Sequence, residues 1–188
     1  MHNINNIIVL SLFLLFAIVV LVNGIKLKSK KEEFLGKTPI NKLIFLSGKI
    51  SMGISWGFFI AQALSINLAF FQVNIYLSWI GTCIFIIGII FVLSSFYYLG
   101  ISSKFGLPGE KLVLVTNGIY SISRNPMYLG FFLISIASCV YCPNPLNFIF
   151  AGVGIIIHHK IVMSEESFLF QQFKEEWIKY KKKVRRYL

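Results

Sequence analysis

Charged residues are scarce in this chain of 188 residues, and aspartate is missing altogether. Only 13% of the residues are charged, against about 25% in a typical soluble domain, and all seven acidic residues are Glu. This scarcity excludes an ordinary water-soluble globule and a disordered tail. A hydrophobic share of 56% and a mean hydropathy of +0.76 indicate an integral membrane protein instead. In that setting the net charge of +11 does not indicate a nucleic-acid partner.

Patterns for metal and redox chemistry are also nearly absent. Cys139 and Cys142 form one C-x-x-C pair, but a membrane thiol oxidoreductase needs a second pair as a relay, so apolar filler is the better interpretation. His158 and His159 are adjacent, hence about 100° apart on a helix, whereas metal-binding helices space two histidines four residues apart. The sequence predicts no metal site, and it contains neither a Rossmann glycine fingerprint nor a P-loop.

Five apolar segments are candidates to cross a bilayer, which takes roughly 20 residues of helix. We expect one membrane domain over residues 1–188, of the all-α class with five transmembrane helices. The expected spans are 4–22, 50–71, 75–98, 127–142 and 146–162. The Pro143–Pro145 turn makes the last two a C-terminal helical hairpin, and the first lacks the positive start and cleavage site of a signal peptide, which favours a retained anchor. Gly53 and Gly57 form a G-x-x-x-G that predicts close internal packing.

The basic residues predict the topology of these spans. Seven lie between the first and second spans, three between the third and fourth, and eight at or beyond the end of the fifth. The turns on the opposite side, 72–74 and 143–145, contain none. By the positive-inside rule the N-terminus faces outside, and the long loops and the C-terminus are cytoplasmic.

A stripe of apolar residues follows the fifth span. Its members recur at spacings of three and four and are Leu169, Phe173, Trp177, Tyr180 and Val184. This spacing predicts an amphipathic cytoplasmic surface helix over residues 164–182, lying along the membrane lipids. The lysines around 179–183 suit retention by anionic lipid.

Two cytoplasmic segments carry polar residues that a lipid anchor does not need. In the first, Pro126 suits the start of a helix, so Arg124, Asn125 and Tyr128 are expected to cluster at a helix N-terminus, a favourable site for an anionic group. The second contains Glu165 and Glu166. A carboxylate at the end of a membrane span is costly unless a cation pairs with it. Arg124 and a positively charged ligand are both candidates for that cation.

These two segments resemble the isoprenylcysteine carboxyl methyltransferases and the related phospholipid methyltransferases. The shared pattern is an apolar strip, Gly-x-Tyr, Arg-His-Pro-x-Tyr, a helical hairpin, Glu-Glu and a terminal Val-x-Arg. In this chain the corresponding segments are Leu112–Val115, Gly118–Tyr120, Arg124–Tyr128, Glu165-Glu166 and Val184–Arg186. The resemblance covers the C-terminal 80 or so residues well, and the N-terminal part by architecture only.

The resemblance implies that S-adenosylmethionine binds within residues 111–188, in a pocket that faces the cytosol under the surface helix. The cofactor-binding residues it implies are Leu112, Val113, Leu114, Val115, Gly118, Tyr120, Asn125, Pro126, Met127, Tyr128, Glu165 and Glu166. The apolar strip would line the adenosine, and Glu165 would meet the polar groups of the cofactor. Arg124 and Lys160 are candidates for the substrate side, and no catalytic residue is assigned.

Three positions depart from the family pattern. Asn125 replaces the usual His and cannot be charged, and Ile161 replaces an Arg one turn before the first Glu, with Lys160 beside it. Lys174 replaces a Gly on the surface helix. Methyl transfer needs alignment in a dry site, and the sequence offers no well-placed base. This weakly favours a carboxylate or an already neutral acceptor among lipophilic molecules that enter from the bilayer.

Two other classes of function stay open at this stage. Membrane sterol and steroid reductases have a similar C-terminal layout but use NADPH, and the cytoplasmic lysines could serve its extra phosphate. A non-catalytic membrane scaffold would bind neither cofactor. The Gly-x-Tyr and Arg-x-Pro-x-Tyr spacing favours the methyltransferase.

Overall fold

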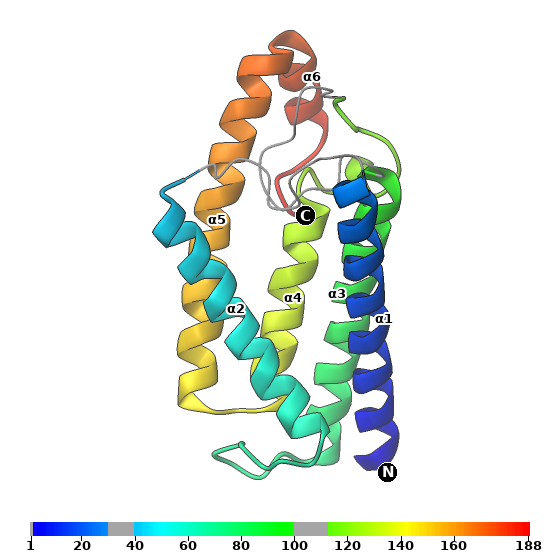
Figure 1. The fold of residues 1–188 in the computed structure, drawn as a ribbon, viewed down its shortest axis with the longest axis vertical. Helices are drawn as coiled ribbons and strands as arrows, with labels where there is room; N and C mark the ends of the chain where they lie inside the picture. The colour runs from blue at the N-terminus through cyan, green and yellow to red at the C-terminus, as the bar shows by residue number, and fades with distance from the viewer. Residues whose placement is uncertain (1, 30–39, 100–112) are drawn as a thin grey trace.

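The computed structural model describes residues 2–29, 40–99 and 113–188, and their regular secondary structure is entirely helical, as the all-α prediction requires. The elements are α1 (His2–Ser29), α2 (Lys42–Ala63), α3 (Ile75–Leu99), the 3-10 turn η2 (Gly118–Ser121), α4 (Pro126–Tyr141), α5 (Pro145–Phe173) and α6 (Glu175–Lys183). Helices α1 to α5 run up and down side by side, and α6 lies with the C-terminus at the end opposite the N-terminus (Figure 1).

Four of the described helices, α1, α2, α3 and α5, are long and apolar enough to cross a membrane. This confirms an integral membrane protein. Helix α4 has 16 residues, which is shorter than a typical span, and its lower end lies above the lower ends of α1 and α3 (Figure 1). The count of five spans therefore stays a prediction.

The second helix lies earlier in the chain than the predicted span 50–71. It begins at Lys42 because the Asn41 side chain accepts a hydrogen bond from the Leu43 N–H at 2.9 Å. It ends at Ala63 because Ser65 adopts a left-handed φ of 66° and closes the helix by a Schellman pattern of hydrogen bonds. The predicted bounds of this helix were wrong because they were taken from hydropathy alone, whereas the capping residues determine where the helix begins and ends.

The predicted surface helix 164–182 is divided between two helices. Residues 164–173 continue α5, and the backbone breaks at Lys174, whose φ is +42°. The buried residues of the stripe, such as Trp177 and Tyr180, pack together with Leu114 and the end of α5. The apolar side of α6 therefore faces the protein.

Close helix packing occurs at other glycines than the predicted pair. A Cβ added to Gly53 or Gly57 would meet nothing within 4 Å, so the prediction of packing there was wrong. The tight contact joins α3 and α4 instead, where a Cβ on Gly130 would lie 2.6 Å from the carbonyl oxygen of Gly88. This contact holds α4 against α3 and fixes the helix that carries Tyr128.

Candidate functional site

Two of the predicted site residues, one on α4 and one on α5, contact each other directly. The Tyr128 hydroxyl donates a hydrogen bond to a Glu165 carboxylate oxygen at 2.7 Å. Tyr128 is buried and Glu165 is half-buried, so their contact lies inside the bundle near the end from which the tail emerges. Tyr120, on η2, is also buried, and burial together with the negative charge of Glu165 raises the pKa of its hydroxyl.

A lysine that the sequence analysis did not single out lies beside this contact. Lys49 of α2 is half-buried, and its ammonium interacts electrostatically with Glu165 and with His158. Its Nζ also lies 4.5 Å from the centre of the Phe45 ring. The available signal was a lysine in the body of an apolar helix, because an ionisable residue in such a place is by default a candidate for function.

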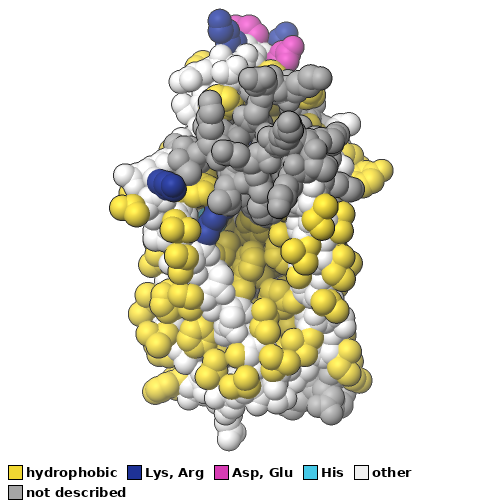
Figure 2. Space-filling view, viewed as in Figure 1, with side chains coloured by type: hydrophobic (Ala, Val, Ile, Leu, Met, Phe, Trp, Pro, Cys, Tyr) yellow, Lys and Arg dark blue, Asp and Glu magenta, His cyan; other side chains and the backbone are white. Residues whose placement is uncertain are grey.

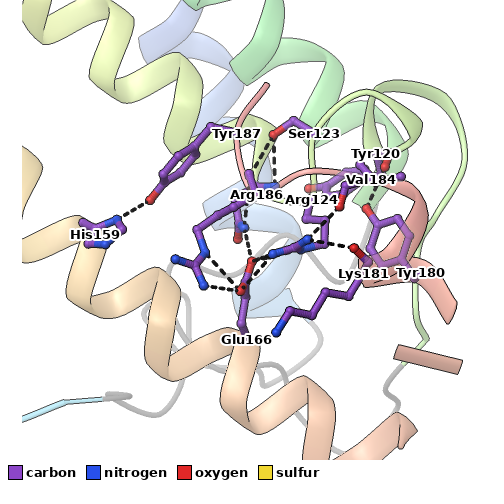
Figure 3. A network of polar contacts seen from close by, with 11 residues as sticks. Tyr120, Ser123, Arg124, His159, Glu166, Tyr180, Lys181, Val184, Arg186 and Tyr187 are labelled. Carbon is purple, nitrogen blue, oxygen red and sulfur yellow. Dashed lines mark hydrogen bonds and ion pairs between the residues drawn. The ribbon is translucent and has the colours of Figure 1, made fainter. Parts of the chain in front are cut away.

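Glu166, the next residue on α5, is enclosed by two arginines (Figure 3). Its carboxylate accepts from Nε and Nη2 of Arg124 at 3.1 and 3.3 Å, and from Nε and Nη2 of Arg186 at 3.1 and 3.0 Å. Asn125 Nδ2 adds a fifth bond at 2.8 Å. These side-chain bonds with Glu166 raise the pKa of Arg186. A carboxylate with five donors has no capacity left for a cofactor, so the predicted binding role of Glu166 does not fit this geometry.

The main chain of the C-terminal tail joins the same network. The Arg124 N–H donates to the Arg185 carbonyl at 3.0 Å, and Arg124 Nη1 donates to the Val184 carbonyl at 2.6 Å. The Ser123 hydroxyl donates to the Arg186 carbonyl at 3.2 Å. The Arg124 side chain is only 6% exposed and lies over the Trp177 ring, so it is committed to holding the tail and does not fit the predicted substrate side.

The tail ends against the spanning helices. The Tyr187 hydroxyl lies 2.7 Å from His159 Nδ1, and its ring packs on Phe132 of α4 (Figure 3). Burial raises the pKa of the Tyr187 hydroxyl to about 12. Lys160, the other predicted substrate-side residue, is exposed. His158 is buried on α5, and its Nδ1–H donates a hydrogen bond to the Gly154 carbonyl oxygen of the same helix at 2.8 Å.

The predicted apolar strip is described from residue 113 onward, and Leu112 lies outside the described residues. Val113 is exposed, whereas Leu114 packs against the cluster around Trp177. Gly118 has a φ of 59°, and the Tyr98 ring occupies the space that a side chain would need, so only glycine fits.

Helix α6 is fixed to η2 by a buried hydrogen bond. The Tyr180 hydroxyl donates to the Tyr120 carbonyl at 2.6 Å. Burial raises the pKa of both tyrosine hydroxyls above the ordinary value. The two tyrosines therefore stay neutral at physiological pH, and their hydrogen bond positions α6 beside η2.

The remaining predicted residues lie in the first turn of α4. Pro126 and Met127 are buried, and Asn125 precedes them as the N-cap without a side-chain capping bond. The helix therefore presents an N-terminus next to the Glu166 network. In the described part of the chain no group of three potential metal ligands occurs, and Cys139 and Cys142 are free thiols.

The sequence matches known proteins over much of its length. The family model described as phospholipid methyltransferase matches residues 76–176. A protein-S-isoprenylcysteine O-methyltransferase of Dictyostelium discoideum is 30% identical over 160 residues, which are 83% of this chain and 63% of that protein. The enzyme of the same name from Saccharomyces cerevisiae is 42% identical over 73 residues, 38% of this chain and 30% of the relative. The chain thus spans less than two thirds of the length of these relatives.

Proposed function

Because the chain belongs to the phospholipid methyltransferase family, we propose that it is an integral-membrane methyltransferase that uses S-adenosylmethionine. Its acceptor would be a lipophilic molecule, an isoprenylcysteine carboxylate or a lipid, that reaches the site from the bilayer. The observation that carries this proposal is the contact between Tyr128 and Glu165, because it gives two family-motif residues one shared position.

The arrangement of the helices supports a cytoplasmic site. We infer that α4 completes a set of five spans and that the N-terminus is outside, because the basic residues of the described chain gather at the end where α6 and the tail lie. Helix α6 would lie at the cytoplasmic surface, over the site. The short α4 then needs little tilt to cross the membrane.

The described residues fit a cationic cofactor. Glu165 offers a carboxylate inside the bundle, where an opposite charge is worth more than in water. Tyr120 and Tyr128 would flank the cofactor, and Val115 and Leu114 would offer apolar contacts to its base. The binding residues we propose are Val113, Leu114, Val115, Gly118, Tyr120, Asn125, Pro126, Met127, Tyr128 and Glu165.

The residues of this chain would act mainly by position. S-adenosylmethionine, when bound, supplies an activated methyl group on a sulfonium. Tyr128 holds the Glu165 carboxylate in place by its hydrogen bond. The Glu166 network closes the tail over α4 and thereby excludes water from the space below. Alignment of an acceptor in such a dry site supplies much of the rate enhancement.

The proposal is tested by ligand binding to the purified protein in detergent. Wild-type protein should bind S-adenosylhomocysteine in a calorimetric titration and should give no heat with NADPH. Glu165→Gln should weaken binding at least tenfold while the protein stays folded, since it removes a charge but keeps an acceptor for Tyr128. Glu176→Gln, at an exposed position of α6, is the matched control and should bind normally.

Other results would support the competing functions. Binding of NADPH with no binding of S-adenosylhomocysteine would favour the reductase. If neither ligand bound, the chain would act as a scaffold. Transfer of a labelled methyl group into a total lipid extract, followed by mass spectrometry, would identify the acceptor.

A further inference from the structure

Lys49 occupies an unusual place for a lysine. It lies in the second turn of α2, a helix that is apolar enough to span the membrane. The side chain is half-buried, and its charge acts on Glu165 of α5. Lys42 lies seven residues earlier on the same face of α2 but is exposed, so the two lysines form a natural comparison. A cation held inside a spanning helix is costly and calls for a functional reason.

The surface next to Lys49 is open. Gly53 lies one turn further along the same face of α2, and a Cβ placed there would meet nothing within 4 Å. Figure 2 shows one face of the molecule, on which hydrophobic side chains line a hollow and basic side chains lie toward its upper end. The hollow is therefore apolar along its length and cationic at one end.

The wall of the bundle beside Lys49 is aromatic. Trp56 lies two turns from Lys49 on the same face of α2, and its ring packs against Phe131 of α4 with 5.5 Å between ring centres. Phe131 in turn contacts the Tyr128 ring at 6.3 Å. A row of aromatic contacts, buried at Phe131 and Tyr128, thus leads from the partly buried Trp56 to the residue that holds Glu165.

The charges around this position favour an anionic guest. In the proposed function Glu165 faces a cationic cofactor, and Lys49 adds a second positive charge next to the same carboxylate. A protonated amine would add a third positive charge in a medium of low dielectric. An acceptor with a carboxylate would balance the charges instead.

We propose that Lys49 binds the carboxylate of the methyl acceptor and that the hydrocarbon part of the acceptor lies in the hollow beside Gly53, against Trp56 and Phe131. This inference rests on the proposed function and assigns Lys49 as the residue that recognises the charge of the acceptor. It places the specificity of the enzyme on α2, outside the two segments that carry the family pattern.

The first test measures direct binding of a labelled probe, N-acetyl-S-farnesyl-cysteine, and of its neutral primary amide. Wild-type protein should bind the acid about tenfold or more tightly than the amide, since the acid alone can form a charge-assisted bond. Lys49→Met should lose this preference by weakening only the acid, and Lys49→Arg should retain most of it. Lys42→Met is the control and should behave as wild type.

Binding of S-adenosylhomocysteine is measured on the same variants. An unchanged cofactor affinity in Lys49→Met, together with the loss of acid preference, supports the inference. Unchanged acid preference overturns it. An equal loss of affinity for both ligands also overturns it, because Lys49 would then act through Glu165. Absence of cofactor binding in the wild type would count against the proposed function itself, whereas the probe experiment tests Lys49 directly.

The second test fills the hollow. Gly53→Leu should weaken binding of acid and amide alike by about tenfold, because the side chain would occupy the space of the hydrocarbon. Gly152→Leu is the control, since Gly152 on α5 also has nothing within 4 Å. Equal behaviour of the two leucine variants would place the hydrocarbon elsewhere.

Discussion

Glu165 and Glu166 are neighbours on α5, yet their carboxylates have different surroundings. Glu165 accepts a hydrogen bond from Tyr128 and faces Lys49, whereas Glu166 is saturated by two arginines and an asparagine. A helix turns by about 100° per residue, so adjacent side chains face different parts of the structure. One glutamate is thus available for ligand binding, and the other stabilises the fold.

This difference predicts opposite effects of removing each charge. Glu166→Gln leaves two guanidinium groups beside a neutral side chain and should lower the free energy of unfolding by about 3 kcal/mol, the lower end for breaking a buried pair. Thermal unfolding in detergent, followed by tryptophan fluorescence, measures the effect. Glu175→Gln, at an exposed position in the first turn of α6, is the control and should change stability by less than about 1 kcal/mol. Equal melting temperatures for the two variants would contradict the structural role of Glu166.

At the scale of helices, small residues decide which pairs approach closely. Gly130 of α4 faces the backbone of Gly88 on α3, and Gly154 of α5 faces Met52 on α2. Asn147, at the start of α5, joins the hairpin to α4 through bonds to the carbonyls of Ser138 and Cys142. These contacts hold the helices that carry Tyr128 and Glu165 in register.

The α3–α4 contact can be tested by adding one methyl group. Gly130→Ala would place its Cβ 2.6 Å from the Gly88 carbonyl oxygen, and rigid backbone cannot yield cheaply. Overpacking of this kind should destabilise the protein by about 1–3 kcal/mol. Gly152→Ala, which has open space around it, should be neutral or slightly stabilising. Comparison of the two melting temperatures checks the contact, and no difference between them would contradict it.

The same elements show what the sequence could predict. Apolar runs indicated the helices because burial in lipid requires them, and the Pro143–Pro145 turn marked the hairpin. The ends of α2 and the break at Lys174 escaped prediction because they depend on caps and on a left-handed backbone. Tyr128 and Glu165 were predicted from their motif. Lys49 was not, because α2 supplies it from a distant part of the chain.

At the scale of the whole molecule, the C-terminal tail closes the cytoplasmic end of the bundle. Carbonyls of residues 184–186 bind the segment before α4, and Tyr187 reaches His159 on α5. Deletion of residues 185–188 removes both the Arg186 ion pair and the Tyr187 packing. We expect the truncated protein to melt several degrees lower and to bind S-adenosylhomocysteine at least tenfold more weakly. Deletion of Leu188 alone, which is exposed, is the control, and equal effects of both deletions would contradict the closing role.

The separation of charge along the bundle also predicts how the molecule sits in the membrane. Gln72 lies in the turn between α2 and α3, at the end without basic residues, and Lys181 lies on exposed α6 at the opposite end. With the three native cysteines replaced, a Gln72→Cys variant in intact cells should react with a membrane-impermeant maleimide, because the positive-inside rule places this turn outside. A Lys181→Cys variant should react only after the cells are opened. The reverse labelling pattern would place α6, and with it the Tyr128–Glu165 contact, on the outer side, where cytosolic S-adenosylmethionine would not reach it.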